Sequence, residues 1–232
     1  TVTCEVDWTV CHDMFFNVDG QDIYQRVTHL DHPERCVILL DHAVPAPTSR
    51  DALGAMYARE FCKRVNIENF IDVGDHAVIH QALVERGYTA PGRLIAGADS
   101  HTCAAGALNC AARGFGPADA TYLLCTGETW FQVAPTILYQ LEGELQKGCT
   151  GKDIFLYIAG TYGDVTGHNV EFGGSGIAGL SISQRQSIAT MCAEINVEFV
   201  VFPCDDRLRE FLRKRGDTAI HAIEPDEDAV YA

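Results

Sequence analysis

The stretch GRLIAGADSHTCAAGALNCAARG, residues 92–114, contains the pattern that decides the fold. Its apolar segment 93–98 predicts a buried strand, and a polar turn beginning at Asp99 follows directly. The small residues of 103–114 predict a helix whose alanines and glycines allow another backbone to approach closely. A buried strand, a polar turn and a helix in this order form the repeating unit of an α/β protein.

The same unit recurs on both sides of this stretch. Expected strands cover 34–42, 69–73, 92–99, 136–145 and 197–203, and expected helices cover 48–67, 76–87, 103–114, 117–127, 151–163, 183–195 and 205–216. This alternation predicts a mainly parallel sheet flanked by helices. Because 163–181 is rich in glycine, we expect an α/β domain over 1–155 and a smaller second α/β lobe over 156–232. The expected core comprises Val37, Ile38, Leu39, Leu40, Leu94, Ile95, Leu123, Ile154, Val200 and Val201.

Composition excludes several classes of function. The chain has 232 residues, of which 47% are hydrophobic and 21% charged, as in an ordinary soluble globular protein. Its 17 basic and 32 acidic side chains give a formal charge of −15, so no basic surface is available for a nucleic acid or an anionic membrane. The apolar runs are far shorter than the roughly 20 residues that cross a bilayer, and we expect no secretory signal. These features predict a cytoplasmic protein that binds small molecules.

The ten cysteines favour buried thiols over a disulfide framework or a metal site. No Cys-x-x-Cys pair occurs, and the cysteines are scattered through the predicted helices and strands. Free cysteine packs as a small apolar side chain in a reducing compartment. The spacing therefore predicts neither a zinc site nor a self-contained iron–sulfur site.

Acidic residues and histidines lie together after three apolar segments. The pairs are His12 with Asp13, Asp41 with His42, and Asp99 with His101. Ligand sites of parallel sheets lie beyond the carboxyl ends of the strands, so we expect these pairs to be catalytic. A carboxylate beside a histidine fixes its tautomer and raises its pKa, which lets the ring donate a proton to a leaving oxygen. This is the chemistry of a dehydratase.

Simpler structural roles stay open for the same residues. Asp41 and His42 could form an N-cap and a turn, and Ser100 or Thr102 could cap the following helix. His80 lies on the apolar face of a predicted helix and could be packed in the core.

Several motifs in this order resemble the aconitase family. They are His12 with Asp13, LDHAVP at 40–45, VIHQALVERGYTAPGRLIAGADSHT at 78–102, TGETWFQVAPT at 126–136 and VEFGG at 170–174. The resemblance covers about residues 7–205 and is strongest to the large subunits of 3-isopropylmalate dehydratase and homoaconitase. It implies a hydro-lyase, a dehydratase or isomerase that removes and re-adds water on a small hydroxy-carboxylate.

The resemblance also implies roles for individual residues. His42 with Asp41, His101 with Asp99, and His80 with Glu171 would form catalytic pairs, and His12, Asp13 and Ser100 would bind the substrate. We expect the three catalytic histidines to share one pocket with the segment DSHT as its floor. The start of the next helix would then attract a substrate carboxylate.

Other parts of the family's catalytic machinery have no counterpart in this sequence. Family members hold a [4Fe–4S] cluster on three cysteines, and its open iron acts on the substrate hydroxyl. The cluster cysteines, the arginines that bind substrate carboxylates and the base that removes the carbon-bound proton all lie outside the region of resemblance. We therefore expect that these residues alone bind no cluster and no other metal, and that a small subunit or missing C-terminal domains supply the rest.

Three interpretations stay open. The chain is a fragment or subunit of an aconitase-like hydro-lyase, or a naturally short enzyme without a cluster that uses histidine–carboxylate pairs on another small substrate, or a non-catalytic binding module on this fold. A chain that begins at Thr1 is also compatible with a processed or excised piece. A homo-oligomer is compatible with each interpretation. Iron and sulfide analysis separates the first interpretation from the second, and a lack of any pocket joining the histidines would favour the third.

Overall fold

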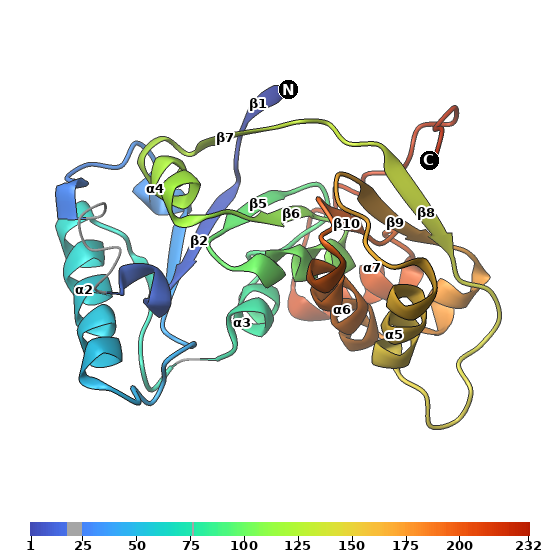
Figure 1. The fold of residues 1–232 in the computed structure, drawn as a ribbon, viewed down its shortest axis with the longest axis horizontal. Coiled ribbons are helices and arrows are strands. Elements are labelled where there is room, and N and C mark those ends of the chain that lie inside the picture. Colours follow the sequence, from blue (N-terminus) through green and yellow to red (C-terminus); the bar gives the residue numbers. More distant parts are fainter. Residues whose placement is uncertain (18–24, 76) are drawn as a thin grey trace. The chain divides into compact units, whose positions relative to one another are not determined.

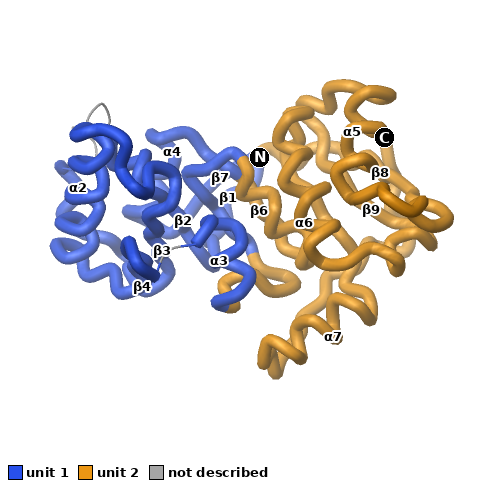
Figure 2. The backbone as a smooth tube through the Cα atoms, turned by 90° about the horizontal axis from the view of Figure 1, so that it is seen from below, with its two compact units in different colours: residues 1–86, 94–100, 114–131 blue, residues 87–93, 101–113, 132–232 orange. Residues whose placement is uncertain are grey.

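The chain forms two compact units in the computed structural model, which describes residues 1–17, 25–75 and 77–232 (Figure 2). Unit 1 comprises residues 1–86, 94–100 and 114–131, and unit 2 comprises residues 87–93, 101–113 and 132–232. Each unit is described by itself below.

The main sheet contains five strands in the order β4-β3-β2-β5-β6. Their bounds are β2 (Trp8–His12), β3 (Cys36–Leu39), β4 (Asn69–Ile71), β5 (Leu94–Gly97) and β6 (Ala111–Gly114). The pairs β2 with β3, β2 with β5 and β3 with β4 are parallel. The chain builds outward from β2 through β3 to β4, and then returns to place β5 on the other side of β2. Figure 1 shows β2 and β5 next to each other. The expected α/β class with a mainly parallel sheet is confirmed.

The helices of unit 1 pack their apolar faces against the buried strands of the sheet. The helices are α2 (Ser49–Val65), α3 (Ile79–Glu85) and α4 (Pro117–Thr126), with short 3-10 turns η1 (Asp13–Phe16) and η3 (Pro33–Arg35). The Thr48 side chain caps α2 by accepting a hydrogen bond from the Asp51 amide, as in a standard N-cap. In the core, Phe16 and Phe61 pack with strand residues such as Ile38. An antiparallel pair, β1 (Val2–Glu5) with β7 (Glu128–Phe131), completes the unit.

Unit 2 contains a smaller parallel sheet with helices packed against it. Its strands β8 (Thr136–Gln140), β9 (Asn169–Gly173) and β10 (Val200–Val201) lie in the order β10-β9-β8. Its helices are α5 (Gly151–Tyr162), α6 (Ile182–Met191) and α7 (Asp206–Arg215), with 3-10 turns η5 (Ser175–Gly179) and η6 (Cys192–Ile195). Phe172 of β9 stacks on Phe202 with ring centroids 4.5 Å apart. None of the helices in the described ranges is both long and apolar enough to span a bilayer.

The segment 103–114 differs from the single helix that its small residues predict. It belongs to a 3-10 helix, η4 (Ser100–Leu108), followed by Asn109 at a φ of 60° and then by β6. The small residues serve close packing instead: a Cβ atom on Gly106 would lie 1.9 Å from the Val200 carbonyl oxygen. The small side chains thus bring η4 against β10, and the left-handed Asn109 ends the helix.

Other differences are smaller. The expected strand 136–145 ends at Gln140, and the expected strand 197–203 shrinks to β10. The expected helix 76–87 begins at Ile79, and residue 76 lies outside the described residues. Seven residues of the expected core are fully buried, whereas Leu94, Ile154 and Val201 are partly exposed.

The two units divide the chain differently from the expected lobes 1–155 and 156–232. Residues 132–155 belong to unit 2, because β8 pairs along its whole length with β9 and α5 packs against α6.

Candidate functional site

The candidate site lies in unit 1, beyond the carboxyl ends of three neighbouring strands. His12 ends β2, Asp41 and His42 follow β3, and Asp99 follows β5. Because β3 and β5 flank β2 on opposite sides, the loops that leave these two strands diverge there. Such a switch in strand order is where open parallel sheets place their ligand sites.

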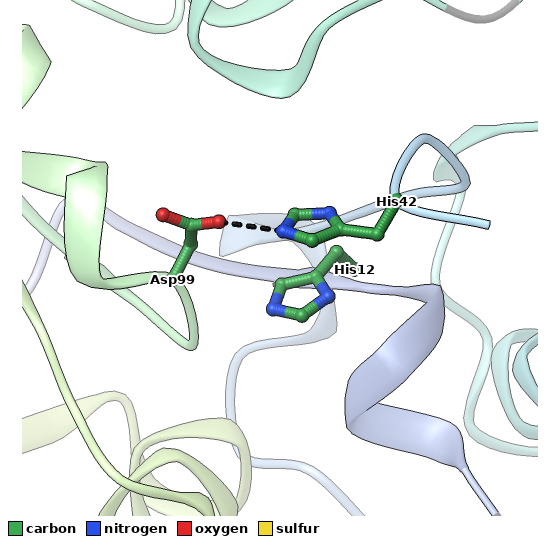
Figure 3. Close-up of side chains that lie close together, drawn as sticks. All are labelled: His12, His42 and Asp99. Atoms are coloured by element: carbon green, nitrogen blue, oxygen red, sulfur yellow. Dashed lines mark ion pairs between the residues drawn. The ribbon is translucent and has the colours of Figure 1, made fainter. Parts of the chain in front are cut away.

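His42 lies between two carboxylates. Its Nε2 atom is 2.8 Å from Asp99 Oδ2 (Figure 3). Its Nδ1 atom is 2.7 Å from Asp41 Oδ1. Hydrogen bonds to Asp41 and to Asp99 raise the pKa of His42 from 6.5 to about 10. The imidazole therefore carries a positive charge at neutral pH, and both of its N–H groups donate to carboxylates.

Asp99 joins a second histidine to this arrangement. Its Oδ1 atom lies 3.3 Å from Nε2 of His80, which stands in the first turn of α3. Asp41 is also held from two sides, since its Oδ2 atom accepts a hydrogen bond of 2.8 Å from the Ile79 amide at the start of α3. Asp41, His42, Asp99 and His80 thus form a continuous chain of alternating acids and bases.

Asp41 is not an N-cap residue, since Thr48 holds that position in α2 and Val78 in α3, although its carboxylate accepts the Ile79 amide. His80 faces a carboxylate and is not simply packed in the core.

His12 differs electrostatically from His42, although the two rings stack (Figure 3). Their centroids are 3.8 Å apart with an interplanar angle of 16°. Burial first, and then the neighbouring His42 charge, lower the pKa of His12. Its Nε2 atom lies 3.2 Å from the Ala98 carbonyl oxygen, which can only accept, so Nε2 carries the proton. Nδ1 of this neutral ring is buried and has no hydrogen-bond partner.

Asp13 binds the backbone of the loop that carries His42. Its Oδ1 atom accepts hydrogen bonds from the amides of Asp41 and His42 at 3.2 and 3.0 Å. Its Oδ2 atom accepts one from the Ala43 amide at 2.7 Å. The carboxylate is 3% exposed. Both oxygens are therefore occupied by the protein itself, whereas the resemblance implies that Asp13 binds the substrate.

The geometry of this cluster suits proton transfer better than cation binding. His12, His42 and Asp99 offer ligand atoms within 4.8 Å of one another, and so do Asp13, Asp41 and His42. However, a metal lies in the plane of a ligating imidazole, and the nearly parallel stack prevents both rings from directing lone pairs at one ion. The His42 cation already occupies the space between the two carboxylates.

The remaining predicted residues lie elsewhere in the chain's two units. His101 belongs to unit 2, where its Nε2 atom is 3.0 Å from Glu194 Oε1. Glu171 of β9 accepts a hydrogen bond of 3.1 Å from the Tyr231 hydroxyl. Ser100 is the exposed first residue of η4. The observed carboxylate partners, Asp99 for His80 and Glu194 for His101, differ from the pairs that the resemblance implies.

Sequence reasoning missed Glu194. It stands near the end of a predicted helix, 93 residues from His101, and no local pattern links this acidic side chain to that histidine.

Most cysteines of this chain are buried free thiols. Burial raises the pKa of Cys36 and Cys62 to about 12, whereas a cluster ligand must be a thiolate. Among the described residues, no three cysteine sulfur atoms lie within 4.8 Å of one another, the spacing at which they could share a single metal ion. That this chain alone binds no cluster stays a prediction, and no catalytic step is derived through one.

The α/β fold agrees with the protein class found by comparison. Residues 9–231 match the Aconitase family (aconitate hydratase), and the chain belongs to this family. A 3-isopropylmalate dehydratase large subunit from Mycolicibacterium smegmatis is 46% identical over 231 residues, which cover 100% of this chain and 54% of the relative. A probable methanogen homoaconitase large subunit from Methanosarcina mazei is 34% identical over 98% of this chain and 59% of the relative. The chain thus spans a little over half the length of these relatives.

Proposed function

We propose that this chain forms the acid–base part of an aconitase-like hydro-lyase that acts on a small hydroxy-carboxylate. The observation that carries the proposal is His42, whose ring donates to two carboxylates and keeps its proton at neutral pH. The names of the relatives suggest 3-isopropylmalate or a homologous hydroxy acid as the substrate.

The proposed step is proton donation from His42 to the departing hydroxyl group. A hydroxide leaving group is far more basic than imidazole, so a protonated His42 can transfer a proton to it as the carbon–oxygen bond breaks. The substrate oxygen would take the place of Asp99 Oδ2 at Nε2, while Asp41 keeps the ring oriented through Nδ1. Loss of the Asp99 hydrogen bond lowers the pKa of His42 and makes it a stronger acid at the moment of transfer.

His12 is the proposed substrate-binding residue beside this acid. Its buried Nδ1 atom carries a lone pair without a donor, and leaving such an atom unpaired costs roughly 1–3 kcal/mol. A substrate hydroxyl would satisfy it by donating a hydrogen bond. The site would thereby offer His42 Nε2 as a donor and His12 Nδ1 as an acceptor to the hydroxyl group of a hydroxy acid. His80, His101, Glu171 and Ser100 remain further candidates.

The remaining parts of the reaction require groups outside this chain. The [4Fe–4S] cluster of the family, the carboxylate-binding arginines and the base belong in our proposal to further domains or to a small subunit, since the relatives are named large subunits. All ten cysteines are free thiols, which favours a reducing compartment, and we place the protein in the cytoplasm.

The test compares two histidine variants in the complete enzyme. The H42N variant should lower turnover by roughly 100-fold or more, because a general acid contributes about 10²–10⁴ in rate. Formation of the unsaturated intermediate is followed by its ultraviolet absorbance. The matched control is H29N, since His29 faces Asp31 at 3.5 Å with both side chains largely exposed.

The control variant should retain full activity. Equal activity of H42N and the unchanged enzyme would contradict the role of His42. A complete enzyme, loaded with iron and sulfide, that neither hydrates nor dehydrates any hydroxy-carboxylate would contradict the proposed reaction itself.

A further inference from the structure

We propose that Asp13 is a positioning residue, whose carboxylate holds the loop after β3 in the conformation that places His42 between Asp41 and Asp99. The importance of Asp13 for catalysis rests on the proposed function. The structural claim, that Asp13 holds His42 in place, does not depend on that reaction.

The first argument concerns the loop itself. Residues 40–48 contain no helix or strand, so no regular hydrogen-bond ladder supports them. Three successive amides of this loop, those of Asp41, His42 and Ala43, all donate to Asp13 in a partly buried setting. One side chain thus determines the path of the chain at the point where His42 leaves it.

The second argument concerns the support of Asp13. It directly follows the last residue of the central strand β2 and begins η1, which packs against α2. A Cβ atom on Gly54 of α2 would lie 3.3 Å from the Asp13 carbonyl oxygen, so the contact with the helix is tight. Asp13 is therefore fixed by the packed elements β2, η1 and α2, and its carboxylate holds a loop without regular structure.

The third argument concerns charge. Asp13 is buried at 3% exposure, and a buried carboxylate is tolerated when hydrogen bonds from N–H groups compensate the loss of water. Hydrogen bonds to an ionised group are about twice as strong as neutral ones. An asparagine of the same shape would present an NH₂ group to at least one backbone N–H and could not hold all three amides.

The expected consequence is a change in the proton affinity of His42. When the loop relaxes, His42 separates from Asp41 and Asp99, and its pKa falls from about 10 toward 6.5. The groups that face His42 are these two carboxylates, the stacked ring of His12 and the carboxylate of Asp13, an oxygen of which lies within 4.8 Å of a His42 ring nitrogen. Because loss of the nearby Asp13 charge lowers the pKa of His42 by itself, the pKa is read together with hydrogen exchange at the amides of 41–43, which D13N should accelerate if Asp13 holds the loop and leave unchanged if it only binds the substrate.

The experiment titrates His42 by NMR, using ¹⁵N-labelled histidine in the protein without substrate. D13N should lower the pKa of His42 by at least about 1 unit, a tenfold change in proton affinity. The matched control is D7N. Asp7 precedes β2 and also accepts a backbone amide hydrogen bond, 2.7 Å from Leu94, but it lies at the opposite end of the strand from His42.

The control should lose stability without changing the pKa of His42. An unchanged pKa in D13N overturns the proposal, and an equal decrease in D7N overturns it too, because the effect would then be general. If D13N does not fold, hydrogen exchange in the unsubstituted protein tests the proposal instead. Slow hydrogen exchange at the amides of 41–43 supports the anchor, and exchange as fast as in an unstructured peptide overturns it.

In the complete enzyme, a positioning role predicts that D13N lowers kcat with little change in KM. A raised KM with unchanged kcat would instead indicate a substrate contact and overturn the inference. Failure of the proposed hydro-lyase reaction would leave the NMR result intact, so the two failures can be distinguished.

Discussion

Two histidines that stack on each other differ in charge because their polar neighbours differ. His42 donates to Asp41 and Asp99, whereas His12 donates to the Ala98 carbonyl oxygen and loses its water by burial. The raised pKa of one ring and the lowered pKa of the other follow from these contacts. His42 therefore carries a proton on both ring nitrogens, while Nδ1 of His12 offers a lone pair.

The raised pKa of His42 predicts how stability depends on pH. The folded pKa of about 10 lies above the unfolded value of 6.5, so His42 contributes its full stabilisation below pH 6.5. This contribution is lost as the pH rises from 6.5 through about 10. Urea unfolding of the protein and of H42Q should show the largest difference at the acidic end of this window. A difference that stays constant across it would contradict the assigned pKa.

At the scale of elements, the turn after β5 places Asp99. The Ala98 amide donates to the Val10 carbonyl oxygen, and the Phe115 amide donates to that of Gly97, so the backbone before Asp99 is held from both sides. Gly114 lies directly against this turn. A Cβ atom there would be 2.4 Å from the Asp99 carbonyl oxygen and 2.8 Å from the Ser100 Cα atom.

This packing predicts the effect of a single methyl group. G114A should destabilise unit 1 by about 1–3 kcal/mol, the usual effect of overpacking, and should lower activity by moving Asp99 away from His42 and His80. Gly116 provides the comparison, since a Cβ atom there meets nothing within 4 Å. G116A should cost less than about 1 kcal/mol, the scale of a helix N-cap. Chemical unfolding of both variants measures the difference, and equal losses would contradict the argument.

At the scale of the whole molecule, the cysteines contribute to the cores of the units. Seven of the ten are buried, Cys4 and Cys125 are partly exposed, and Cys149 is exposed. Burial raises the pKa of Cys11 and Cys192, which keeps these thiols protonated and unreactive. The thiols therefore act as small apolar side chains.

Site-resolved alkylation tests this distribution. In the native protein Cys149 should react first, and the seven buried cysteines should react only after unfolding. Replacing Cys149 by serine should remove the fast reaction. Modification of Cys36 or Cys62 at the rate of Cys149 would show that the core of unit 1 is not packed as described.

Much of this molecule was predictable from local sequence patterns. Alternating apolar runs and helical periodicity identify β3, β5 and α2, since each pattern depends only on which side chains share a face. The polar residues His12, Asp41 and Asp99 are recognisable as strand-end residues for the same reason. The division of 103–114 into η4 and β6 was not predictable. Small side chains indicate close packing, but they do not show which element packs against them.

Local patterns were enough to place histidines and carboxylates at the ends of parallel strands. Which of these side chains contact one another depends on the strand order. Asp99 contacts His42 and His80, 57 and 19 residues earlier in the chain, because β5 returns to the side of β2 opposite β3. The same strand order directs Asp13 to the backbone of 41–43. Strand order depends on how the whole set of apolar faces is buried together, and no local pattern carries that information.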